Sequence, residues 1–178
     1  MSTHLYFAYG SNLLRERLLA RCPGAIFIGR ACLPGHRLTF DKVSRDGSGK
    51  CAFVPAQNSR VEGVLWEIPD VELPKLDRME GAGHGYERDT VTVTLVDGGQ
   101  CDALTYRATE CEPGLKPYDW YLALVKAGAE QQGLPDEVRV MLAGMQALLD
   151  PLPERPARQE ALEVLRKAGF EEVARGLE

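Results

Sequence analysis

Residues 5–13 read Leu-Tyr-Phe-Ala-Tyr-Gly-Ser-Asn-Leu, and this is the most informative stretch of the sequence. Its apolar, aromatic first half predicts a short buried strand, which Gly10 breaks. Residues 13–20 then place leucines among charged residues at helical spacing, so we expect a helix with Ser11 or Asn12 as its N-cap. The sequence therefore predicts a strand, a tight glycine loop and a helix at this end.

The glycine loop has two interpretations. A glycine between a strand and a helix lets the backbone approach a bound molecule closely. The free N–H groups at the start of the following helix favour an anion such as a carboxylate. An ordinary strand-to-helix turn that binds nothing has the same pattern, so the loop alone leaves both interpretations open.

The rest of the chain reads as strands first and helices last. The expected elements are strands at 25–28, 37–40, 61–68, 90–96 and 101–108, a polar loop at 43–50, a helix at 70–80, and helices after residue 117 with a break at 133–135. This order is typical of an α+β protein rather than a doubly wound sheet. We expect a single domain over residues 1–178, of which residues 137–178 form a helical tail.

The composition excludes several function classes. The 178 residues carry a formal net charge of −5, with 44% hydrophobic and 26% charged residues, as in ordinary globular proteins. The acidic balance argues against broad electrostatic binding to nucleic acid or to an anionic membrane. The sequence has no long apolar run for a transmembrane helix and no basic, apolar leader, so we expect a cytoplasmic protein.

The cysteines and histidines do not form a recognisable site. The five cysteines are far apart and include no Cys-x-x-Cys pair: Cys22, Cys32, Cys51, Cys101 and Cys111. They are expected to be reduced, and neither a disulfide framework nor a zinc site is predicted. A cysteine hydrolase that pairs one thiol with His84 is a further alternative, although the three histidines lack metal-ligand spacing.

Glu80 is the second candidate functional residue. It ends the predicted helix at 70–80, immediately before Gly81, a typical helix-ending residue. A carboxylate there faces the negative end of the helix dipole, which disfavours its charged form. Such a glutamate is suited to accept and release a proton near neutral pH, although solvated glutamates are also common at helix ends.

The opening block resembles the γ-glutamyl cyclotransferase family. Further blocks that are similar to the family follow in the family's order, at residues 61–66, 76–81, 86, 121, 128–130 and 133–135. The resemblance implies a small mixed β-barrel flanked by helices, with a pocket at the strand-loop-helix opening. It also implies an enzyme that releases 5-oxoproline from a γ-glutamyl compound without metal or cofactor.

The resemblance also assigns site residues. Glu80 matches the family's general acid/base. The positions that match its substrate-binding residues are Tyr6, Phe7, Ala8, Tyr9, Gly10, Ser11, Asn12, Tyr86 and Tyr121. In this chemistry the substrate's own α-amine attacks its γ-carbonyl, so no serine or cysteine nucleophile is needed.

The identity of the leaving group stays open. Asn12, where another branch has leucine, resembles the branch that acts on γ-glutamyl amino acids rather than the glutathione-specific branch. Some family members instead remove a γ-glutamyl protecting group from a biosynthetic amine. A non-catalytic binding module on the same fold is the other alternative. Because the family includes dimers, a homodimer is an expectation for the assembly.

Overall fold

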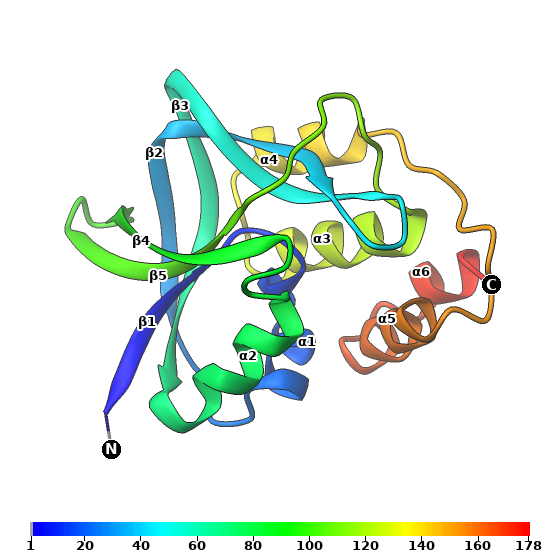
Figure 1. Ribbon diagram of the computed structural model, residues 1–178, viewed down its shortest axis with the longest axis horizontal. Helices are drawn as coiled ribbons and strands as arrows, with labels where there is room; N and C mark the ends of the chain where they lie inside the picture. The colour runs from blue at the N-terminus through cyan, green and yellow to red at the C-terminus, as the bar shows by residue number, and fades with distance from the viewer. Residues whose placement is uncertain (1) are drawn as a thin grey trace.

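The computed structural model describes residues 2–178 and consists of a closed five-stranded barrel with helices packed beside it (Figure 1). The elements are β1 (Thr3–Ala8), the 3-10 turn η1 (Ser11–Leu13), α1 (Arg15–Arg21), β2 (Ile26–Val43), β3 (Gly49–Pro69), the 3-10 turn η2 (Asp70–Glu72), α2 (Leu73–Glu80), β4 (Tyr86–Leu95), β5 (Gln100–Ala108), α3 (Asp119–Gln131), α4 (Asp136–Ala143), α5 (Pro156–Lys167) and α6 (Glu171–Gly176). The α+β prediction and the small mixed barrel are confirmed.

The strands follow the order β1-β3-β2-β4-β5 around the barrel. Neighbours along this order are antiparallel, and a parallel contact of β1 with β5, at Tyr6 and Leu104, closes the barrel. A closed barrel has no free strand edges, and its interior is filled by side chains. The end of β1 is thereby held between two strands, and the loop that follows it has a fixed starting point.

The two longest strands differ from their predicted lengths. One bent strand, β2, occupies the region where two short strands were predicted, and β3 begins at Gly49 rather than at residue 61. The β2–β3 register shifts at three places, between Phe27 and Gly29, between Pro34 and His36, and at Thr39–Lys42. A β-bulge can accommodate a glycine or proline without ending the strand. The glycine and proline residues in this region were therefore wrongly interpreted as ends of short strands.

The start of α1 differs from its prediction. The α-helix begins at Arg15 after the 3-10 turn, and Leu14 precedes it without a side-chain cap. Neither Ser11 nor Asn12 caps the helix, so that prediction is wrong. The Ser11 hydroxyl instead accepts a hydrogen bond from Arg17 Nε at 3.0 Å, and Asn12 turns toward α2.

The end of α2 matches its prediction. Gly81 has a left-handed backbone with φ of +69°, and its N–H and that of Ala82 bond to carbonyls of the last turn. This is the usual way in which a glycine ends a helix. Glu80 is therefore the last helical residue, and the glycine cap fixes where α2 ends.

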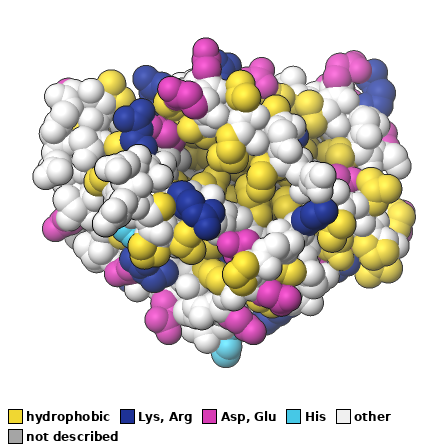
Figure 2. Space-filling view, turned by 90° about the horizontal axis from the view of Figure 1, so that it is seen from above, with side chains coloured by type: hydrophobic (Ala, Val, Ile, Leu, Met, Phe, Trp, Pro, Cys, Tyr) yellow, Lys and Arg dark blue, Asp and Glu magenta, His cyan; other side chains and the backbone are white. Residues whose placement is uncertain are grey.

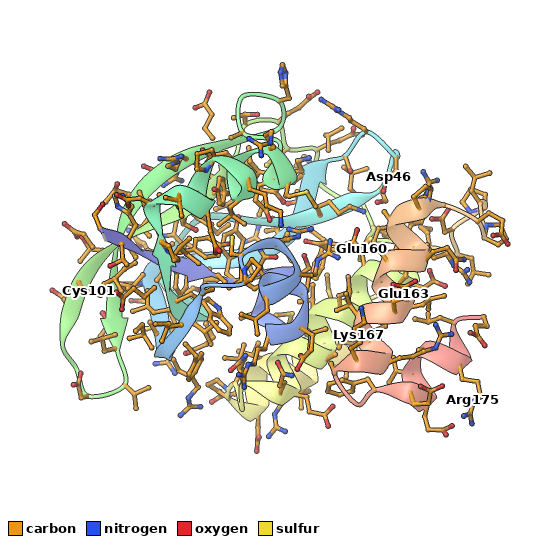
Figure 3. All side chains as sticks on the ribbon, turned by 90° about the horizontal axis from the view of Figure 1, so that it is seen from below. Asp46, Cys101, Glu160, Glu163, Lys167 and Arg175 are labelled. Carbon is orange, nitrogen blue, oxygen red and sulfur yellow. The ribbon has the colours of Figure 1, made fainter. Side chains whose placement is uncertain are left out.

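The helical half of the chain supports the loop after β1. Residues 133–135 separate α3 from α4 as predicted, and α3 packs against η1. On α5, Glu160 pairs with Arg17 of α1, and Figure 3 shows the position of Glu160 on that helix. The tail after residue 137 is thus part of the packed structure and contacts the element that carries the loop.

The packing of α3 on η1 depends on Gly128. A Cβ atom at Gly128 would lie 2.6 Å from both Leu13 Cβ and the backbone nitrogen of Leu14. Because backbone atoms cannot move aside as a flexible side chain can, Gly128→Ala is expected to lower the free energy of unfolding by about 1–3 kcal/mol.

Urea denaturation measures this effect of Gly128→Ala. The matched control is Gly176→Ala at the end of α6, where an added Cβ would meet no atom within 4 Å. Equal unfolding free energies for the two variants would contradict the close packing inferred at Gly128.

The surface has mixed charge. In Figure 2, acidic and basic side chains are interspersed, and hydrophobic side chains gather in the central hollow of the face shown. Within residues 2–178, no helix has the length and apolarity needed to cross a membrane.

Candidate active site

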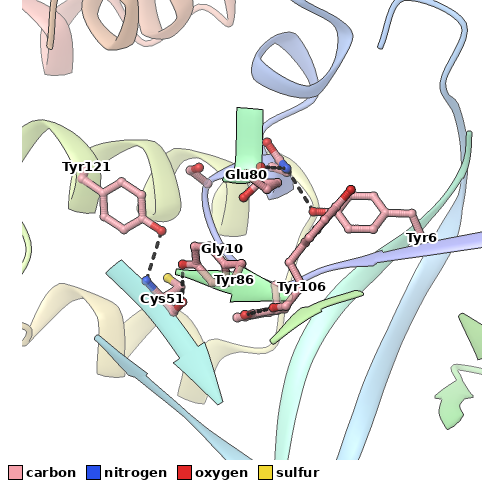
Figure 4. Close-up of a pocket in the computed structure, with 10 residues that line it drawn as sticks. Tyr6, Gly10, Cys51, Glu80, Tyr86, Tyr106 and Tyr121 are labelled. Carbon is pink, nitrogen blue, oxygen red and sulfur yellow. Dashed lines mark hydrogen bonds between the residues drawn. The ribbon is translucent and has the colours of Figure 1, made fainter. Parts of the chain in front are cut away.

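A pocket lies where the end of β1 meets the end of α2 and the first turn of α3 (Figure 4). The residues that line it are Tyr6, Tyr9, Gly10, Ser11, Asn12, Cys51, Glu80, Tyr86, Tyr106 and Tyr121. The loop, Glu80 and the two later tyrosines were predicted as site residues, whereas Cys51 and Tyr106 were not. Phe7 and Ala8 were also predicted, but both are fully buried in the barrel and do not line the pocket.

The two carboxylate oxygens of Glu80 differ in their hydrogen bonding. Oε1 accepts hydrogen bonds from Asn12 Nδ2 at 2.8 Å and from Arg21 Nη1 at 2.5 Å. No hydrogen bond among residues 2–178 uses Oε2, and the side chain is only 16% exposed. One oxygen is therefore held by the protein, and the other is available to a molecule in the pocket.

Arg21 supplies a positive charge to the site that was not predicted from the sequence. Its side chain is 7% exposed, and Nη1 also donates to Asn12 Oδ1 at 3.1 Å. The guanidinium places a positive charge beside Glu80 Oε1 and fixes the orientation of the carboxylate.

Arg17 lies one helical turn before Arg21 and contacts the glycine loop at Ser11. Burial lowers its pKa to about 10, so it is still a cation at neutral pH. Its guanidinium contacts Ser11 Oγ on one side and Glu160 Oε1, at 3.4 Å, on the other. These two arginines concentrate positive charge next to the loop of an acidic protein.

The loop also presents backbone donors. The N–H groups of Leu13 and Leu14 close the 3-10 turn by bonding to the carbonyls of Gly10 and Ser11. In the described chain, no hydrogen bond has the N–H of Gly10, Ser11 or Asn12 as its donor. Successive free N–H groups in a turn form a concave site for an anion.

Tyr6 and Tyr106 form one wall of the pocket. Their rings meet edge to face with centroids 5.8 Å apart, and the Tyr6 hydroxyl accepts a hydrogen bond from Asn12 Nδ2 at 3.0 Å. Burial raises the pKa of both phenols well above the usual value, and the Glu80 charge adds to the shift. Both are neutral hydroxyls at physiological pH. Tyr106 could not be predicted because only barrel closure brings β5 beside β1.

Tyr86 and Tyr121 fix the opposite wall at Cys51. The Tyr86 hydroxyl donates to the Cys51 carbonyl at 2.7 Å, and the Tyr121 hydroxyl accepts from the Cys51 N–H at 3.1 Å. Burial raises the pKa of both tyrosines well above the usual value. They therefore hold β3 in place as neutral phenols, with their hydroxyl groups at the pocket.

The Cys51 thiol does not have the character of a nucleophile. Burial raises its pKa to about 12, so the reactive thiolate is nearly absent at neutral pH. His84 is not among the residues that line this pocket. Within residues 2–178, no three His, Cys, Asp or Glu side chains are grouped as metal ligands.

Iodoacetamide at pH 7.5 is therefore expected to leave activity intact. The exposed Cys111 is the thiol that reagents reach most easily, whereas Cys51 is buried and protonated. Peptide mass spectrometry alongside the activity assay checks this expectation. Inactivation that parallels carbamidomethylation of Cys51, and that substrate prevents, would support the cysteine hydrolase alternative instead.

Comparisons with known proteins agree with the architecture. The family model "Gamma-glutamyl cyclotransferase, AIG2-like" matches residues 6–123. The chain is 35% identical over 144 residues to the gamma-glutamylcyclotransferase of Bos taurus, covering 78% of this chain and 76% of that protein. It is 34% identical over 148 residues to the Homo sapiens protein of the same name, covering 80% and 78% of the two chains. A solved structure named gamma-glutamyl cyclotransferase superposes with a TM-score of 0.83 at 27% identity, covering 93% of this chain and 99% of that one.

Proposed function

Because the chain belongs to the gamma-glutamyl cyclotransferase, AIG2-like family, we propose that it is a γ-glutamyl cyclotransferase with Glu80 as its general acid/base. The reaction converts a γ-glutamyl compound into 5-oxoproline and a free amine or amino acid. The assignment of Glu80 rests on the different environments of its two carboxylate oxygens. Oε1 is held by Asn12 and Arg21, and Oε2 is available in the pocket.

The free backbone donors of the loop are suited to the substrate's α-carboxylate or to the oxyanion that develops at the γ-carbonyl. The N–H groups of Gly10, Ser11 and Asn12 are available for this role, because none of them donates a hydrogen bond to another group in the described residues. The buried Arg17 and Arg21 add favourable charge for an anion. Holding a glutamyl chain so that its amine meets its own γ-carbonyl can contribute about 7–11 kcal/mol through orientation alone.

The proton balance is consistent with a single carboxylate. The α-ammonium loses a proton to Glu80 Oε2, and the resulting amine attacks the γ-carbonyl carbon to form the five-membered ring. The C–N bond to the leaving amine then breaks, and its electron pair stays on the leaving nitrogen. Two protons leave the attacking nitrogen in total and two arrive at the leaving one, so Glu80 carries protons and ends as a carboxylate.

The pocket tyrosines position the substrate rather than react with it. Tyr6, Tyr86 and Tyr121 have strongly raised pKa values because they are buried, so they act as neutral hydrogen-bonding groups. A neutral phenol does not compete with Glu80 for the α-ammonium proton. Tyr6 is tied to the same Asn12 side chain that holds Glu80, which links substrate orientation to carboxylate orientation.

Incubation with a panel of γ-glutamyl amino acids, amines and peptides tests the proposal. We expect release of 5-oxoproline from at least one class. Absence of product from the whole panel would overturn the enzyme assignment. Thermal stabilisation by 5-oxoproline or glutamate without turnover would favour the binding module. Turnover of γ-glutamyl amines alone would indicate removal of a protecting group from an amine.

A further inference from the structure

A second hollow adjoins the pocket and shares Glu80 with it. It has a volume of about 370 Å³ and lies between the end of α2 and the loop after β2. Its ionisable residues are Lys42, Arg45, Arg78, His84 and Glu80, so Glu80 is the only carboxylate on its lining. We refer to this hollow as the basic groove. The whole chain has a net charge of −5, whereas the lining of this groove carries more positive than negative side chains.

Lys42 is the most constrained cation in the basic groove. The residue is only 8% exposed, and no salt bridge or hydrogen bond in residues 2–178 uses its ammonium group. The nearby carboxylate of Asp46 pairs instead with Lys50 at 3.0 Å. The Lys42 nitrogen is not among the fully buried side-chain atoms without a partner, so its ammonium group is accessible to an anion in the groove.

The surroundings of Lys42 orient its ammonium group. Nζ lies 4.8 Å from the centroid of the Tyr86 ring, on the wall between the groove and the pocket. Gly85 leaves room for it, because a Cβ atom there would lie 2.9 Å from Lys42 Nζ. Burial lowers the pKa of Lys42, while Asp46 and Glu80 oppose that shift. The side chain is therefore positioned next to the pocket.

The proposed reaction explains why such a cation would adjoin the site. Glu80 must deliver a proton to the leaving nitrogen, so the leaving half of the substrate has to lie beside the same carboxylate as the glutamyl half. The loop and the tyrosines line the pocket, and the basic groove is a second space that Glu80 lines. The leaving half would thus meet Lys42, with Arg45 and Arg78 farther out.

We infer that the basic groove binds the leaving half of the substrate and that Lys42 selects leaving groups that carry a carboxylate. This inference rests on the proposed function, and it assigns a specificity-determining residue that the cyclisation chemistry itself does not require. The carboxylate would be the partner that the Lys42 ammonium lacks. The exposed cations Arg45 and Arg78 favour the same charge at the mouth of the groove.

A matched substrate pair tests the inference. γ-Glutamyl-alanine and γ-glutamyl-alaninamide have nearly the same shape, but only the first has a negative charge on its leaving half. We expect the wild-type kcat/KM to be at least about tenfold higher for the acid. Lys42→Met should lower kcat/KM for the acid about tenfold, mainly through KM, and change that for the amide by less than about twofold.

Three variants make the result specific. Lys42→Arg should keep the preference for the acid, because the charge is retained. Lys167→Met, on α5 (Figure 3) and outside the lining of both hollows, removes an exposed lysine charge and should leave the turnover of both substrates unaffected. Arg45→Met changes an exposed side chain at the groove and should reduce the preference to a smaller extent than Lys42→Met does.

Several outcomes would overturn the inference. One is a wild-type enzyme that uses acid and amide equally well. Another is a Lys42→Met variant that loses activity equally on both substrates, since that result indicates a purely structural role. If Lys42→Met does not fold, an unchanged preference in Arg45→Met has the same consequence. Failure of both substrates, and of every other γ-glutamyl compound, would instead overturn the proposed function itself.

Discussion

Glu80→Gln is expected to lower kcat for 5-oxoproline release by about 10²–10⁴-fold, with little change in the fold. The amide oxygen of the glutamine can still accept the hydrogen bonds that Glu80 Oε1 accepts from Asn12 and Arg21 in the wild-type protein. It cannot take a proton from the α-ammonium group at neutral pH. The loss should therefore fall on kcat rather than on KM, because the shape of the pocket is retained.

Glu87→Gln provides the matched control for Glu80→Gln. Glu87 is an exposed residue at the start of β4, outside both hollows, so its neutralisation should leave kcat unchanged. Thermal denaturation of both variants separates a catalytic defect from unfolding. Substantial activity in folded Glu80→Gln would remove Glu80 from the acid/base role.

Arg21→Met is expected to lower the free energy of unfolding by about 3–5 kcal/mol and to reduce activity as well. The Arg21 guanidinium bridges Glu80 Oε1 and Asn12 Oδ1, and both ends of the Arg21–Glu80 pair are largely buried. Removing one partner of such a pair leaves the other charge uncompensated in a poorly solvated place. The activity should fall because the Glu80 carboxylate loses the group that fixes its orientation.

Two comparisons distinguish this role of Arg21 from general packing. Arg175→Met breaks an exposed pair with Glu172 on α6 and should cost no more than about 1 kcal/mol. In the Glu80→Gln background, Arg21→Met should cost less than it does alone, because the charge it compensates is already absent. Equal costs in the two backgrounds, measured by urea denaturation, would contradict the proposed coupling.

The local features of the site could be predicted from the sequence. The strand, the glycine loop and the end of α2 at Gly81 follow from short-range patterns, so the residues around them are enough to place the loop and Glu80. The β4–β5 hairpin at residues 97–99 is local in the same sense. These elements depend on neighbouring residues, and propensity and turn chemistry act at that range.

The features that depend on distant pairing could not be predicted. Tyr106 and Cys51 reach the pocket only because β5 and β3 close around β1. The N-cap prediction for α1 failed for the same reason, because the Asn12 side chain donates its hydrogen bond to Glu80, which is distant in the sequence. A signal for Arg21 did exist: with Arg17 it forms an i, i+4 pair of cations on a leucine-rich helix. Like charges at this spacing are unfavourable in isolation, so the pair predicts other groups that compensate it.

The parallel contact of β1 with β5 has a consequence for how the chain folds. It joins Tyr6 to Leu104, about a hundred residues apart in the sequence, so the strand that is synthesised first completes its pairing only after most of the chain has emerged. Until then, β1 and β5 are unpaired edges that can associate with other chains. We expect refolding yield to fall with protein concentration, and activity to return no earlier than barrel closure, because the loop and Tyr106 meet only at that step.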